Sequence, residues 1–81
     1  MTFHELQQRL LEELRQRVRS GAVTERGLAR LSGISQPHLH NVLKGKRLLS
    51  MDKADELLRH LQIDVLQLIP PEELRESGRR R

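Results

Sequence analysis

Residues 23–45 decide the fold and read VTERGLARLSGISQPHLHNVLKG. Thr24 is a residue type that caps helix N-termini, and apolar residues follow it at the spacing of one helix face. The pair 32–33, serine and glycine, then interrupts the pattern, because glycine readily adopts the left-handed conformation of a tight turn. Ser35 offers a second cap. The stretch therefore predicts two short helices, at about 25–31 and 36–44, joined by a tight turn.

Three more helices are predicted around this pair. Thr2 and Glu5 fit a capping box, and apolar residues recur every three or four positions through residues 3–19. Ser50 begins a fourth helix that ends near residue 61, and Asp64 begins a short fifth one that the prolines at 70–71 stop. The expected buried stripe of the fourth helix is Met51, Ala54, Leu57, Leu58 and Leu61.

The predicted fold class is all-α, a compact bundle of five short helices that contains a helix-turn-helix, with the pair at 24–44. Residues 1–70 are expected to form one domain, because the chain of 81 residues has room for one small core. Residues 71–81 are expected to form a flexible, basic C-terminal tail.

Composition argues against several classes of protein. There is no cysteine, which removes disulfides and thiolate chemistry, and Phe3 is the only aromatic residue, which disfavours base stacking on single strands. His38 and His40 point about 200° apart on a helix and so cannot chelate one metal ion. No catalytic constellation, cofactor motif or membrane span is visible. We expect a cytoplasmic protein that is not an enzyme and uses no metal or cofactor.

Basic residues gather on the central pair of helices. The net charge is +4, and residues 79–81 supply three of these charges, yet residues 26–53 contain a single acid among several lysines and arginines. Such a surface attracts a phosphate backbone. The predicted phosphate contacts are Thr24, Arg26, Lys44, Lys46 and Arg47. The alternative is a solvated basic loop.

One face of the predicted 36–44 helix carries side chains suited to DNA bases. The amide of Gln36 donates and accepts at once, which matches adenine in the major groove, and Asn41 has the same chemistry or reaches a phosphate. Pro37 offers an apolar surface to a thymine methyl group or serves helix initiation alone. His40 lies one turn after Gln36. The predicted base contacts are Gln36, Pro37, His40 and Asn41, against the alternative that Gln36 only bonds its own helix start.

Residues from about Val23 to Ile69 resemble the lambda-repressor-like (Xre-type) helix-turn-helix family. The matching parts are Thr24, Leu28-Ala29, Gly33 to Gln36, Leu39, Val42, Gly45 to Arg47 and residues 66–69. The resemblance implies a compact domain of four or five helices whose 36–44 helix enters the DNA major groove.

The sequence departs from the family pattern at three places. Glu25 stands where glutamine is common, and a carboxylate would repel phosphate, so we expect it to brace Gln36 or to accept a hydrogen bond from Arg26 or Arg30. Leu43 replaces a common acidic residue. Residues 48–49, both leucine, replace a proline-containing turn, which suggests extra apolar packing, including packing between subunits.

These observations predict a sequence-specific, repressor-like transcriptional regulator that binds duplex DNA as a homodimer. Two recognition helices would then read half-sites about 34 Å apart. The alternative is a protein-interaction module, such as an antitoxin. The candidate interface residues are Leu48, Leu49, Ile63, Leu66 and Ile69, with core packing favoured for the last two.

Overall fold

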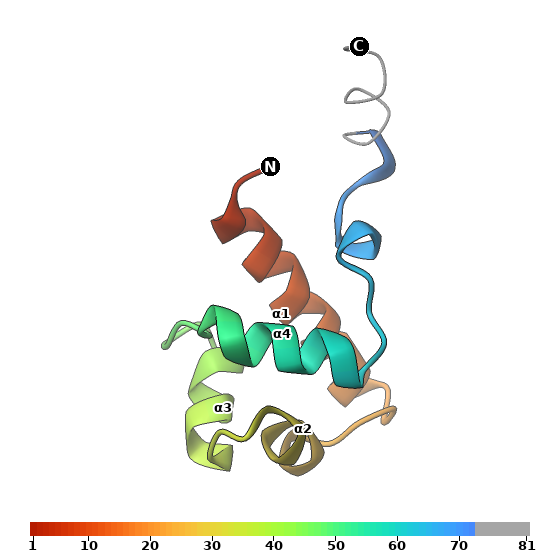
Figure 1. The fold of residues 1–81 in the computed structure, drawn as a ribbon. Helices are drawn as coiled ribbons and strands as arrows, with labels where there is room; N and C mark the ends of the chain where they lie inside the picture. Colours follow the sequence, from red (N-terminus) through yellow and green to blue (C-terminus); the bar gives the residue numbers. More distant parts are fainter. Residues whose placement is uncertain (73–81) are drawn as a thin grey trace.

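Four α-helices and a short 3-10 helix follow one another along residues 1–72, the part of the chain that this computed structural model describes (Figure 1). The elements are α1 (Phe3–Arg19), α2 (Glu25–Ser32), α3 (Gln36–Leu43), α4 (Met51–His60) and η1 (Val65–Leu68). No strand occurs in these residues. The predicted all-α class and the helix-turn-helix are confirmed. Most of the predicted tail, residues 73–81, lies outside the described residues.

Each element begins at the cap that the sequence predicts. In every case a side-chain oxygen accepts a hydrogen bond from a backbone N–H two or three residues ahead, which satisfies one of the free donors of the first turn. The caps are Thr2, Thr24, Ser35, Ser50 and Asp64. Three of the helices are followed by glycines in the left-handed region, Gly21 at φ 84° after α1, Gly33 at φ 77° after α2 and Gly45 at φ 81° after α3.

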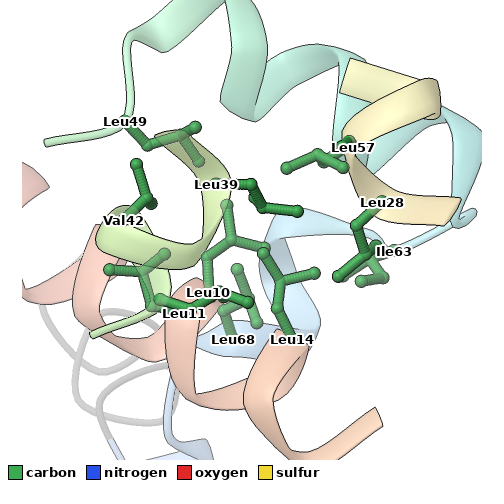
Figure 2. Packing of buried hydrophobic residues seen from close by; sticks show 12 residues of the cluster. Leu10, Leu11, Leu14, Leu28, Leu39, Val42, Leu49, Leu57, Ile63 and Leu68 are labelled. Atoms are coloured by element: carbon green, nitrogen blue, oxygen red, sulfur yellow. The ribbon is translucent and has the colours of Figure 1, made fainter. Parts of the chain in front are cut away.

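The core forms where one apolar face of each helix meets the others (Figure 2). Helix α2 packs against α3 and α4, and α1 packs against α3 and η1. Leu14, Leu28, Leu39, Val42 and Leu57 have no exposed surface. Each of the four α-helices therefore supplies at least one fully enclosed side chain. In the helix-turn-helix, α2 is also packed against α4, and α3 is also packed against α1.

Two hydrogen bonds tie the end of α3 and the following loop to α1. The side-chain amide of Gln7 donates to the main-chain oxygen of Leu49 at 2.8 Å, and Nε of Arg15 donates to that of Leu43 at 2.6 Å. Leu49 is itself buried in the core, as is Ile63. Both were candidates for a subunit interface, and their burial within one chain removes them from it.

The fifth helix is a 3-10 turn rather than an α-helix. Pro70 restricts Ile69 to extended backbone, so only four residues remain between Asp64 and the end of the element. With three residues per turn, Val65 and Leu68 face the same side, and Leu66 points away and is 57 % exposed. The expectation that Leu66 is a core residue is wrong, and Ile69 is half-buried.

Met51 is a second residue whose predicted burial is wrong. It is 69 % exposed, whereas Leu57 of the same predicted stripe is fully buried. Met51 is the first residue of α4, and no other element covers it. Together with the exposed Phe3 it borders an apolar groove of about 260 Å³ between α1, α4 and η1.

Candidate nucleic-acid interface

Helices α2 and α3 are held close together by a short turn and by the core. The Oγ of Ser32, which is buried, donates to the main-chain oxygen of Ala29 and accepts from the N–H of Ile34, so the turn is fixed from inside. On α3, Leu39, Val42 and Leu43 face the core. The opposite side of α3 is therefore free to meet a partner.

The four predicted base-contacting residues lie together on that free side. Gln36, Pro37, His40 and Asn41 line one shallow depression of about 370 Å³, and Glu25 of α2 completes it. We call this surface the reading depression. Gln36, Pro37 and His40 are exposed and Asn41 is half-buried. All four side chains therefore occupy one continuous surface of the helix-turn-helix, while their contact with bases stays a prediction.

The predicted phosphate contacts lie at the edges of the helix-turn-helix. Lys44 caps the end of α3, Lys46 and Arg47 follow in the loop, and Arg26 lies in the first turn of α2. All four are exposed, and none forms an ion pair within residues 1–72. Their positive charges are thus available to a phosphate backbone.

Thr24 has a structural role beside its predicted phosphate contact. Its Oγ1 accepts a hydrogen bond from the N–H of Gly27 at 2.9 Å and so caps α2. A hydroxyl that accepts one hydrogen bond still carries a proton to donate. The side chain is exposed, so the cap leaves this donor free for a phosphate oxygen.

The sequence did not predict one polar contact between α2 and α3 that lies within the reading depression. Nδ1 of His40 lies 3.2 Å from Oε1 and 3.4 Å from Oε2 of Glu25. Within residues 1–72, Glu25 is hydrogen-bonded to neither Gln36 nor the two arginines expected beside it. The partners are 15 residues apart, so only the packing of α2 on α3 brings them together. The expectation that Glu25 braces Gln36 of α3 was the one available hint.

Other kinds of site are not assembled in the described part of the chain. Within residues 1–72, no group of three histidine or acidic side chains is placed to hold a metal ion. No helix in this range combines the length and the apolar character needed to cross a bilayer.

The fold and this surface define a DNA-binding domain of the helix-turn-helix class. The sequence model of the helix-turn-helix family HTH_3 matches residues 11–68, most of the chain. The protein belongs to this Xre or lambda-repressor-like family and is a DNA-binding helix-turn-helix regulator. No curated protein and no solved structure matches the chain significantly.

Proposed function

We propose that the protein is a repressor-like transcriptional regulator that recognises a specific duplex sequence with α3 in the major groove. The observation that carries the proposal is the reading depression. Four side chains able to contact base edges share one surface on α3, and uncompensated basic residues lie at both ends of the helix-turn-helix. Base contacts supply specificity in this arrangement, and the basic residues supply affinity and register.

We propose further that it acts as a homodimer. One α3 helix covers only a few base pairs, and a two-fold pair would read half-sites about 34 Å apart with much higher specificity. Of the apolar residues considered for the interface, Leu48 is 75 % and Leu66 is 57 % exposed. Both side chains are therefore accessible to a second subunit, unlike the buried Leu49 and Ile63.

The test is selection of binding sites from a randomised duplex library by the purified full chain, with affinities measured at two salt concentrations. Enrichment of a palindromic site is the expected result and would identify the operator. Salt-sensitive binding without enrichment would contradict sequence-specific recognition. Sedimentation of Leu48→Gln and Leu66→Gln variants, each bound to the selected site, would then show whether these leucines join the subunits.

A protein-interaction module, such as an antitoxin, is the alternative function. The exposed face of α3 carries amide, imidazole and ammonium groups, and such polarity suits a wet DNA interface better than the centre of a protein interface. We therefore rank DNA recognition first. Failure to bind any duplex at low salt would reverse this order.

A further inference from the structure

The contact between Glu25 and His40 lies inside the reading depression. The carboxylate side chain of Glu25 is 31 % exposed and the imidazole of His40 is 47 % exposed, so both are partly withdrawn from solvent. Both line the depression with Gln36 and Asn41. The contact is thus positioned to influence how His40 meets a base.

A carboxylate decides which ring nitrogen of a neutral histidine carries the proton. An ionised carboxylate has only acceptor atoms, so a hydrogen bond from Nδ1 of His40 to Glu25 requires the proton on Nδ1. In a neutral imidazole the other nitrogen, Nε2, then presents a lone pair. Nε2 of His40 has no hydrogen-bond partner within residues 1–72.

Basic side chains lie on the other side of the Glu25–His40 pair. Glu25 and His40 also border a second depression, which Arg15 and Arg19 of α1 and Lys44, the C-cap of α3, line. Among the residues that line the reading depression, Glu25 is the one acidic or basic side chain apart from the imidazole, so its carboxylate is the hydrogen-bonding partner that can select the tautomer of His40.

We propose that Glu25 is a positioning residue that holds His40 in the Nδ1–H tautomer, so that Nε2 accepts a hydrogen bond from a base. In the major groove, the donors are the N6 amino group of adenine and the N4 amino group of cytosine. The pair therefore specifies an amino-bearing base at one position of each half-site and disfavours guanine there. This inference rests on the proposed sequence-specific binding.

Glu25→Gln is the decisive variant because it keeps the size of the side chain and removes the constraint. The amide of glutamine accepts through its oxygen or donates through its nitrogen, so it permits either tautomer of His40. It also removes a negative charge near DNA, which raises affinity for every duplex. Base preference, rather than affinity, is consequently the informative quantity.

The chain offers a matched control in α4. Oε2 of Glu56 lies 3.2 Å from Nε2 of His60, so this is a second carboxylate–histidine pair at the same distance, and it lies outside the reading depression. Glu56→Gln therefore removes the same kind of contact and the same charge. It should leave the tautomer of His40 and the base preference unchanged.

The first measurement needs no DNA. Nitrogen-15 spectra of the imidazole rings at pH 8 report the tautomer of each histidine in the full chain. We expect the Nδ1–H form for His40 in the wild type and in Glu56→Gln, and a substantial Nε2–H population in Glu25→Gln. A wild-type His40 in the Nε2–H form would overturn the inference whether or not the protein reads sequence.

The second measurement is selection from the randomised duplex library at pH 8 with the wild type and three variants. The wild type should favour adenine or cytosine at one position per half-site, and His40→Ala should lose this preference. Glu25→Gln should lose discrimination against guanine there by roughly tenfold, the order of one base-edge hydrogen bond, with other positions unchanged. Glu56→Gln should match the wild type.

Different results would contradict the role given to Glu25 and the proposed function. A palindromic wild-type site whose preferences Glu25→Gln leaves intact would overturn the role of Glu25 and leave the proposed function standing. Absence of any enriched site would overturn the proposed function, and with it the reading of a base by His40.

Discussion

Arg15 in the middle of α1 holds Leu43, the last residue of α3, through a hydrogen bond of 2.6 Å from Nε to the main-chain oxygen. The last carbonyls of a helix lack partners within it and carry partial negative charge, so a guanidinium is a favourable donor to them. The orientation of the candidate recognition helix is therefore linked to a helix that lies outside the helix-turn-helix.

Arg15→Ala should lower the free energy of unfolding by about 1–2 kcal/mol, because a half-buried, charge-assisted hydrogen bond is lost. Urea denaturation measures this directly. Arg9→Ala is the control, since Arg9 is exposed on the same helix and forms no ion pair within residues 1–72. Equal unfolding midpoints for the two variants would contradict the role given to Arg15.

Gly33→Ala should destabilise the protein by about 1 kcal/mol. Gly33 has φ 77°, a conformation in which a Cβ atom is strained, and an added Cβ would lie 3.2 Å from Nζ of Lys53. Gly33→Asn is the matched comparison, because asparagine tolerates the left-handed region better than alanine. Thermal unfolding should rank the wild type above the asparagine variant and the alanine variant last. The reverse order of the two variants would show that conformational strain at residue 33 is unimportant.

Gln36→Ala should relax base preference at one position of the selected site, with a loss of discrimination of about 1–3 kcal/mol if the amide makes two hydrogen bonds to adenine. Competition between the best duplex and single-base variants measures this loss. Gln16→Ala, at an exposed position of α1 outside the reading depression, should have no effect. Unchanged preference in Gln36→Ala would contradict a base contact by Gln36.

Lys44→Ala and Arg47→Ala should each weaken binding to all sequences alike. Both residues are exposed and form no ion pair within residues 1–72, so each is free to neutralise one phosphate. The slope of the logarithm of the binding constant against the logarithm of salt concentration should fall by about one for each change. Arg9→Ala again serves as the control. A changed base preference would instead assign these residues to base recognition.

Local chemistry explains why much of the fold was predictable. A cap such as Ser35 and a left-handed glycine such as Gly33 act within three or four residues, and the sequence displays both partners. The grouping of side chains on one face of α3 was equally predictable, because residues three and four apart share a side of a helix. This is sufficient to gather Gln36, His40 and Asn41 on one surface.

The errors and omissions come from distant neighbours or, at Leu66, from the type of helix that forms. Met51 has the right spacing for a buried stripe, yet burial requires another element above it, and none is there. Leu66 was misplaced because a 3-10 turn repeats every three residues, whereas an α-helical spacing was assumed. The bond of Arg15 to Leu43 spans 28 residues and has no sequence pattern.

The division of α3 into buried and exposed residues separates two properties of the protein. Leu39, Val42 and Leu43 pack in the core and stabilise the fold. Gln36 and His40 are exposed and do not pack in the core. Under the proposed function, exchange of the outward residues for those of another helix-turn-helix should therefore change the preferred duplex sequence and leave the stability of the fold nearly unchanged. Surface chemistry and folding stability can therefore be altered independently of each other in this helix.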